Sequence, residues 1–329
     1  MTHYRSLNSW LREMYDGKVY KLALDGGFTC PTRDGSKGTD GCIFCAGGSG
    51  EFSIPVNGDV ATAIETAKSV VNGKGAEKYI AYFQSYTGTY APLERLRNLY
   101  TQTVEHPDIV ALSIGTRPDC LDREVLELLS ELNATKPIWV ELGLQTIHPE
   151  TADYIRRGYP LSVFDDAVAS LQERKLNIVV HMIIGLPGET PEMIRQTAEY
   201  IGKSGAQGIK FQLLHELEDT DLAKDYRARK FQVLSLEGYI KILESCIESI
   251  PPEMVVHRLT GDGAKRSLIA PLWSGDKKRV LNEINAAFER DQVVQGFRFV
   301  QKPLWAARNA RIEGEEEGAA DENNQNAEE

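Results

Sequence analysis

Apolar, strand-like runs that alternate with helix-forming segments are the feature of this 329-residue chain that most restricts its fold. Such a succession of strand and helix units predicts an α/β protein with a parallel sheet. Because the runs are almost continuously apolar, we expect both faces of the sheet to be covered. The sheet is then either open and doubly wound or curled into a partial barrel, and in both cases functional side chains collect where strands end. The six runs are residues 19–28, 78–85, 109–115, 138–145, 178–185 and 208–214.

Helix signals lie between these runs. Residues 60–71 carry apolar side chains at helical spacing and end before an Asn-Gly pair. Thr190 is placed to cap a helix that starts at Pro191. A later helix over residues 235–250 is stopped by two prolines, and a seventh strand candidate follows at residues 254–260. The chain shows no internal repeat beyond this alternation.

Charge is distributed unevenly along the chain. Residues 313–329 hold eight acidic side chains, no basic one and no apolar side chain larger than alanine, so we expect a disordered tail. Residues 1–312 then hold 37 basic and 40 acidic side chains. This near balance neither requires nor excludes a nucleic-acid partner.

No targeting signal stands out. The longest mainly apolar stretch, residues 178–186, is too short to span a bilayer, and residues 1–10 lack the apolar core of a secretory signal. We therefore expect a cytoplasmic protein with no membrane partner. In a reducing compartment its five cysteines are poor disulfide candidates and better metal ligands.

Three cysteines follow the first strand run closely. Cys30 precedes a glycine-rich loop, and Cys42 and Cys45 form a C-x-x-C pair after it. The glycines allow the loop to fold back and bring Cys30 to that pair, which suits one metal centre. Zinc would need a fourth ligand, for which Cys120 and the histidines remain candidates. Three thiolates without a fourth instead suit a [4Fe–4S] cluster with one open iron.

These motifs resemble the YhcC/YtqA-like family of the radical S-adenosylmethionine (SAM) superfamily and, more distantly, the radical subunit of the Elongator complex. The eleven residues between Cys30 and Cys42 differ from the spacing of three that is common in the superfamily but agree with this family. The resemblance covers about residues 4–300. It rests on DGGFTCP at 25–31, RDG at 33–35, GCIFC at 41–45, YFQSYT at 82–87, SIGTRPD at 113–119, ELGLQ at 141–145, HMIIGLPGE at 181–189 and LTGD at 259–262.

The resemblance implies an enzyme that binds a [4Fe–4S] cluster and SAM. Residues 1–312 would form one domain, a partial (β/α)6 barrel with a C-terminal extension packed on it. Cys30, Cys42 and Cys45 would ligate three irons, and SAM would chelate the fourth. Electron transfer from the cluster would then cleave SAM to methionine and a 5′-deoxyadenosyl radical. The reductant would be a protein such as flavodoxin or ferredoxin. The residues expected to contact SAM are Phe44, Gln84, Ser85, Ser113, Arg117, Glu141, Gln145, Ile184 and Gly185.

Some of these assignments have a structural alternative. Glu141 and Gln145 lie four residues apart on one strand and so point to one face, where two polar groups in an apolar barrel favour ligand contact. Arg117 suits a carboxylate or phosphate, but its Arg-Pro-Asp segment is equally consistent with a structural turn. Cys120 is the one candidate for an auxiliary catalytic thiol, whereas Cys246 lies on the apolar side of a helix and is assigned to the core.

The same resemblance implies tRNA as the substrate. The favoured reaction converts a 5-carboxymethylaminomethyl group on uridine 34 toward the aminomethyl form. RNA binding would need basic side chains beside aromatic rings. The alternatives are a radical SAM enzyme for a small metabolite or peptide, and a non-enzymatic, zinc-stabilised α/β binding protein. The candidate RNA-contacting residues are Arg156 and Arg157 with Tyr154 and Tyr159, and Lys277, Lys278 and Arg279 with Trp273.

Overall fold

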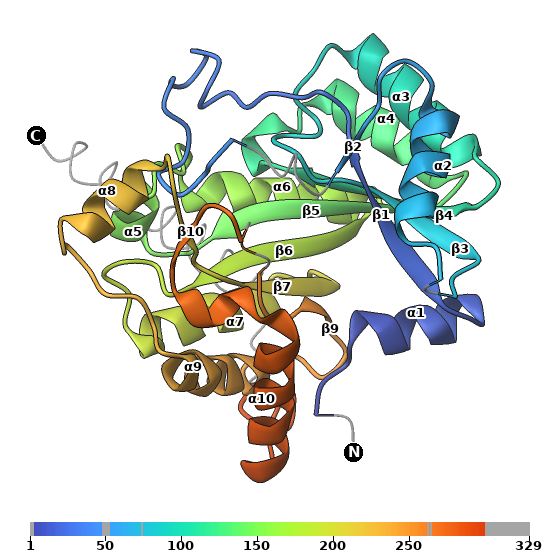
Figure 1. The fold of residues 1–329 in the computed structure, drawn as a ribbon. Helices are drawn as coiled ribbons and strands as arrows, with labels where there is room; N and C mark the ends of the chain where they lie inside the picture. The colour runs from blue at the N-terminus through green and yellow to red at the C-terminus, as the bar shows by residue number, and fades with distance from the viewer. Residues whose placement is uncertain (1–2, 48–52, 74, 262, 264, 300–329) are drawn as a thin grey trace, which may run out of the picture.

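A curled, eight-stranded parallel sheet forms the centre of the computed structural model (Figure 1). The structure describes residues 3–47, 53–73, 75–261, 263 and 265–299, so the expected tail at 313–329 lies outside the described residues. The strand order is β2-β1-β3-β4-β5-β6-β7-β9, which is the partial barrel expected from the resemblance. The strands are β1 (Val19–Asp25), β2 (Ile54–Pro55), β3 (Lys78–Phe83), β4 (Ile109–Thr116), β5 (Ile138–Gln145), β6 (Asn177–Ile184), β7 (Gly208–Leu213) and β9 (Val255–Arg258).

Helices cover the outer face of this sheet (Figure 1). The expected cap at Thr190 is confirmed, since its side chain accepts a hydrogen bond from the backbone N–H of Met193. No helix within the described ranges is both long and apolar enough to cross a membrane. The helices are α1 (Leu7–Tyr15), α2 (Val60–Val70), α3 (Leu93–Glu105), α4 (Arg123–Asn133), α5 (Pro149–Tyr154), α6 (Leu161–Glu173), α7 (Pro191–Lys203), α8 (Asp221–Arg227), α9 (Leu236–Glu248) and α10 (Lys277–Arg290).

The six predicted strand runs and the seventh candidate all form strands, with ends that differ by a few residues. Three short strands were not predicted: β2, and the antiparallel pair β8 (Glu216–Leu217) and β10 (Leu268–Ala270). Strands of two or three residues are too short to show a periodic pattern, so the sequence carries no signal for them.

An apolar layer closes the amino-terminal end of the barrel. Leu11 of α1 packs with Val19, Ile80 and Val179, which point inward from three strands. Trp139 of β5 joins this layer and lies 5.2 Å from the ring of Trp10. Helix α1 thus blocks the end of the barrel opposite to the end at which the strands finish (Figure 1).

Above this layer, one buried carboxylate connects side chains from several strands. Glu141 of β5 is 1% exposed. Its Oε1 accepts hydrogen bonds from Lys21 of β1 at 2.7 Å and Ser113 of β4 at 2.6 Å. Its Oε2 accepts from His181 of β6 at 2.8 Å and from Lys210 of β7. Burial alone would raise the pKa of Glu141, but the charges of Lys21 and Lys210 hold it well below its ordinary value.

We expect the substitution Glu141→Gln to lower the free energy of unfolding by about 3–5 kcal/mol, because it leaves buried lysine charges without a partner. Chemical denaturation measures the loss. Glu131→Gln, which removes an exposed ion pair with Arg97, is the matched control and should change stability by about 0.5 kcal/mol or less. Adding Lys210→Met to Glu141→Gln should recover part of the loss, and a strictly additive double variant would contradict the coupling.

The loss in Glu141→Gln should also depend on pH. Burial lowers the pKa of Lys210 and Glu141 opposes this shift, so the substitution lowers the pKa further. The unfolded chain then binds a proton that the folded chain does not, up to the ordinary lysine pKa of about 10.4. In the wild type Lys210 itself loses its proton near pH 7, because burial lowers its pKa to about 7. Stability of the variant relative to the wild type should therefore increase as the pH rises from 5 to about 7 and then stay constant, and a decrease would contradict this assignment.

Candidate functional site

The three predicted cysteine ligands line one cavity of about 380 Å³ at the carboxyl ends of the strands. The loop after β1 turns back on itself, since the N–H of Lys37 donates to the carbonyl of Pro31 and that of Gly41 to Thr32. Gly41 has φ +71°, and a Cβ there would lie 2.7 Å from the Arg33 Nε. A residue other than glycine would be strained at this turn, which agrees with the expected role of the loop glycines.

Basic side chains flank the thiols. Burial raises the pKa of Cys42 to about 11, and Arg117 and Arg33 oppose that rise. The guanidinium of Arg33 donates to the carbonyl oxygen of Cys45. Because thiolates, not thiols, ligate metals, a bound metal must displace the proton of Cys42. Positive charge beside the thiols lowers the cost of gathering several thiolates in one place.

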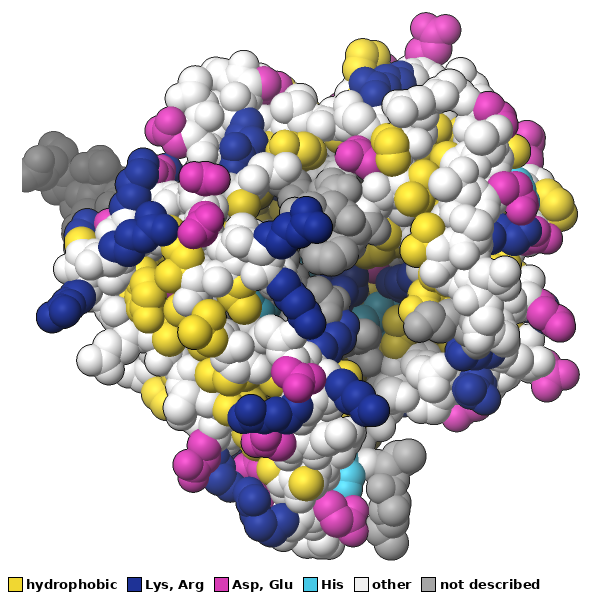
Figure 2. Space-filling view, viewed as in Figure 1, with side chains coloured by type: hydrophobic (Ala, Val, Ile, Leu, Met, Phe, Trp, Pro, Cys, Tyr) yellow, Lys and Arg dark blue, Asp and Glu magenta, His cyan; other side chains and the backbone are white. Residues whose placement is uncertain are grey.

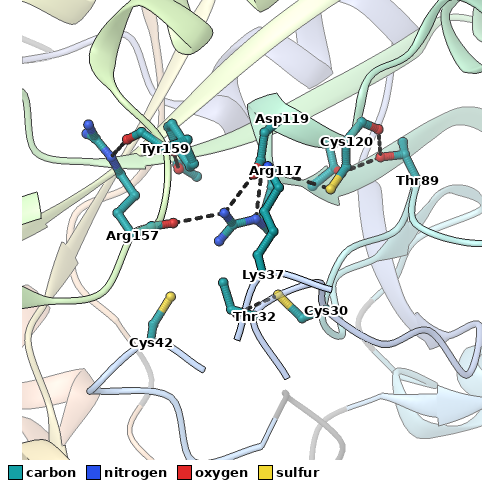
Figure 3. A network of polar contacts seen from close by, with 12 residues as sticks. Cys30, Thr32, Lys37, Cys42, Thr89, Arg117, Asp119, Cys120, Arg157 and Tyr159 are labelled. Carbon is teal, nitrogen blue, oxygen red and sulfur yellow. Dashed lines mark hydrogen bonds and ion pairs between the residues drawn. The ribbon is translucent and has the colours of Figure 1, made fainter. Parts of the chain in front are cut away.

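Arg117 forms an ordered network beside the cysteine loop (Figure 3). Its Nε and Nη2 each donate to Asp119 at 2.9 Å, and Nη2 also donates to the carbonyl of Arg157 at 2.8 Å. Lys37 pairs with the same carboxylate at 2.6 Å. Although burial opposes the shift, Arg117 and Lys37 hold the pKa of Asp119 below its ordinary value. Arg117 is therefore committed to structural contacts, and Figure 3 shows Cys30 and Cys42 on the same side of this network.

The donor set fits an iron–sulfur cluster better than zinc. A tetrahedral zinc holds its sulfurs about 3.8 Å apart, as follows from Zn–S bonds of about 2.3 Å. Within the described residues, the group of three candidate ligand atoms that all lie within 4.8 Å is Glu65, His106 and Asp108, not the three thiols. Among the described residues that line the cavity there is no fourth cysteine. Three thiolates without a fourth suit a [4Fe–4S] cluster with one open iron.

Five of the nine predicted SAM-contacting residues line this cavity, namely Phe44, Gln84, Arg117, Glu141 and Gln145. The other four are not among the described residues that line it. Ser85 is 2% exposed, Ser113 donates to Glu141, and Ile184 is part of the core. Gly185 has φ +96°, and a Cβ at this position would lie 3.1 Å from the Cδ1 of Leu234. The SAM assignments therefore gain a common location for the first five residues only.

Gln145 carries an unsatisfied polar atom in the cavity. Its Oε1 is buried and has no hydrogen-bond partner among the residues that the structure describes, and its backbone has φ +70°. The pairing of β5 with β6 shifts register between Gly143 and Gln145. A strained backbone and an unpartnered buried oxygen are both costly, and both are typical of residues that meet a ligand. This observation supports a hydrogen-bonding ligand, such as SAM, beside the cysteines.

The remaining candidates are resolved by their contacts. Cys120 lines a different cavity of about 620 Å³, and burial raises its pKa to about 12, so it is a protonated thiol at neutral pH. Cys246 is buried in the core as predicted. Two residues that sequence reasoning did not single out, Tyr82 and Gln212, also line the cysteine cavity. The sequence signal that could have identified Gln212 is a polar side chain within an otherwise apolar strand, which also occurs at Lys210.

Comparisons with known proteins agree with this site. The Radical SAM superfamily model matches residues 35–201, and the Radical_SAM C-terminal domain model matches residues 206–290. YtqA of Bacillus subtilis is 42% identical over 301 residues, covering 91% of this chain and 93% of YtqA. YhcC of Escherichia coli is 36% identical over 287 residues, covering 87% and 92% of the two chains.

A solved structure shows the same fold. The archaeal Elp3 of Methanocaldococcus infernus superposes with a TM-score of 0.63 at 17% identity, covering 84% of this chain and 64% of that one. With the sequence matches, this confirms the expected family, the partial barrel and the pair of cofactors. The chain is a radical SAM superfamily enzyme of the family that includes YtqA and YhcC, and members of this superfamily bind a [4Fe–4S] cluster and SAM.

Proposed function

We propose that this enzyme modifies the side chain of uridine 34 in tRNA. The observation that carries the proposal is a similarity to proteins described as tRNA uridine(34) acetyltransferases. The one from Methanocaldococcus jannaschii is 31% identical over 158 residues, which is 47% of this chain and 28% of that protein. The favoured change converts a 5-carboxymethylaminomethyl group toward the aminomethyl form.

The chain's own residues would divide the work at the cavity. Cys30, Cys42 and Cys45 would hold the cluster, and the unpartnered Oε1 of Gln145 would accept a hydrogen bond from SAM. When bound, the cluster and SAM together supply the 5′-deoxyadenosyl radical that removes hydrogen from a substrate. The ion pair of Arg117 with Asp119 fixes the wall beside the cysteines, and apolar residues below the floor exclude water.

A basic rim supports an RNA substrate. Figure 2 shows Lys and Arg side chains gathered around a hollow near the centre of the face that it presents. Positive charge around a concave site attracts a phosphate backbone without reading sequence. A single flipped nucleotide would reach the cavity through such an opening.

The predicted aromatic contacts to RNA need correction. Arg157 and Tyr159 are only 3% and 7% exposed. The guanidinium of Arg157 donates hydrogen bonds to the backbone carbonyls of Leu144, Thr146 and Tyr159. Buried side chains of this kind cannot form an exposed rim, so placing these two residues there was wrong. The hydroxyl group of Tyr154, the other tyrosine predicted to contact RNA, donates a hydrogen bond to the carboxylate of Asp225 at 2.8 Å.

The other rim candidates have mixed placements. Arg156 pairs with Asp221 at 2.6 Å. Trp273 donates from its indole nitrogen to the carbonyl of Leu234 and packs on Tyr239. Lys278 and Arg279 lie in the first turn of α10 and are exposed, and Arg279 pairs with Glu283 at 2.7 Å. Of the two predicted groups, the start of α10 therefore remains the better candidate for contact with RNA phosphates.

Cluster binding is tested by changing Cys30, Cys42 and Cys45 together to alanine. After anaerobic reconstitution, the wild type should hold about four irons with matching sulfide and should form 5′-deoxyadenosine from SAM, whereas the triple variant should do neither. Dithionite replaces the flavodoxin or ferredoxin that we expect as reductant. Cys246→Ala is the matched control, since that thiol is buried outside the cavity, and should retain the cluster. One zinc per chain without sulfide would contradict the assignment.

The substrate is tested by adding tRNA to the reconstituted enzyme. We expect tRNA from cells that lack this enzyme to raise 5′-deoxyadenosine formation several-fold, because substrate binding excludes water from the cavity and orders the reacting groups. Nucleoside mass spectrometry should show uridine 34 altered in that tRNA. No stimulation by tRNA, together with stimulation by a small-metabolite fraction, would contradict the proposed substrate and favour a small-molecule enzyme.

A further inference from the structure

A chain of three polar side chains leads from the barrel interior to the cavity surface. Gln212 of β7 lines the cavity, and its Nε2 lies 3.1 Å from the Nδ1 of His181. The Nε2 of His181 lies 2.8 Å from the Oε2 of Glu141. Each of these residues comes from a different strand, so the chain crosses the floor of the cavity.

The direction of each hydrogen bond in this chain is fixed by chemistry. Glu141 is ionised, so its carboxylate only accepts hydrogen bonds. The Nε2 of His181 must therefore carry the proton that it donates. Burial and the nearby charge of Lys210 lower the pKa of His181 to about 4, so its ring is neutral at pH 7 and Nδ1 carries a lone pair.

This tautomer determines the orientation of the Gln212 side-chain amide. An Nδ1 lone pair accepts only from the NH₂ group of the amide, so the Oε1 of Gln212 has to point away from His181. Among the described residues that oxygen has no hydrogen-bond partner, although the side chain is only partly exposed. The cavity thus presents the Oε1 of Gln212, which is open to a ligand, together with the buried and unpartnered Oε1 of Gln145.

We propose that Gln212 recognises the substrate by accepting a hydrogen bond from an N–H group, and that His181 and Glu141 are positioning residues that keep its acceptor oxygen turned inward. A ligand group that carries only acceptors would leave this oxygen unpaired and be rejected. The substrate class is therefore one that offers a hydrogen-bond donor at this point, such as an amine or an imide. This deepens the proposed function and rests on it, since a 5-carboxymethylaminomethyl uridine has both a side-chain amine and a ring imide.

The first experiment measures the tRNA concentration that gives half-maximal stimulation of 5′-deoxyadenosine formation by the holoenzyme. Gln212→Met keeps the length of the side chain but removes the acceptor, and it should raise this concentration about tenfold. Gln196→Met, on the exposed face of α7, is the matched control and should leave it unchanged. The half-saturating SAM concentration, measured in parallel, should not rise equally, because an equal rise would indicate a collapsed cavity and overturn the proposal.

Two variants of His181 test its positioning role. His181→Phe removes the acceptor for the Gln212 amide, so the amide is free to turn, and the half-maximal tRNA concentration should rise as in Gln212→Met. His181→Asn can keep an acceptor oxygen close to the position of Nδ1 and should recover part of the loss. A general structural role would instead make the smaller asparagine at least as damaging as phenylalanine, and that order would contradict the positioning role.

A second measurement does not depend on the substrate. In the oxidised holoenzyme labelled with ¹⁵N-histidine, the signals lost in His181→Asn identify His181, and their shifts should report a neutral ring protonated at Nε2. A ring protonated at Nδ1 would turn the Gln212 oxygen toward it and overturn the proposal.

If tRNA fails to stimulate the wild type but the small-metabolite fraction succeeds, the proposed function fails. The Gln212→Met comparison is then made with that fraction, and an unchanged half-maximal amount overturns the Gln212 assignment.

Discussion

The buried carboxylate of Glu141 is the constraint on which this partial barrel depends. The sheet is open, so no hydrogen-bonded ladder joins its first strand to its last. Lys21 on β1 and Lys210 on β7 nevertheless reach the two oxygens of the same carboxylate from opposite parts of the strand order. This ionic cross-brace, formed by Lys21, Glu141 and Lys210, connects the two sides of the sheet and so helps to maintain its curl. A slip of β5 by one residue would turn Glu141 to the outer face and break every one of these contacts.

The cross-brace is costly, which argues for a functional reason to keep it. Taking two lysines and a carboxylate out of water costs several kcal/mol per ion, and an apolar layer of the same volume would often be as stable. The barrel already has such a layer, in which Trp139 and Ile80 pack against α1. The charged layer lies directly above it, at the floor of the cysteine cavity. Its position between a sealed base and an open site indicates that it serves the site as well as the fold.

Strand periodicity explains why much of this was predictable. Successive inward residues on β5 are Trp139, Glu141 and Gly143, so two-residue alternation correctly placed Glu141 inside the barrel. The loop glycines predicted that Cys30 would return toward the C-x-x-C pair, and all three cysteines line one cavity. The partners of Glu141 were not predictable, because they lie on four other strands and depend on the register of each pairing. The sequence pattern also shows no sign of the irregular pairing beside Gln145, since such a shift depends on the neighbouring strand.

The same register dependence links the fold to recognition in the cavity. A neutral histidine next to a carboxylate has only one tautomer that satisfies both groups, and this choice passes to whichever side chain meets the other ring nitrogen. In this enzyme that side chain is Gln212, one strand further along the sheet. The charge that braces the barrel thereby determines whether the cavity floor presents an oxygen or an N–H group to a ligand. Replacing the charged layer by apolar residues could preserve the barrel, but it would leave the amide of Gln212 free to turn, and the site would lose its means of distinguishing a donor from an acceptor.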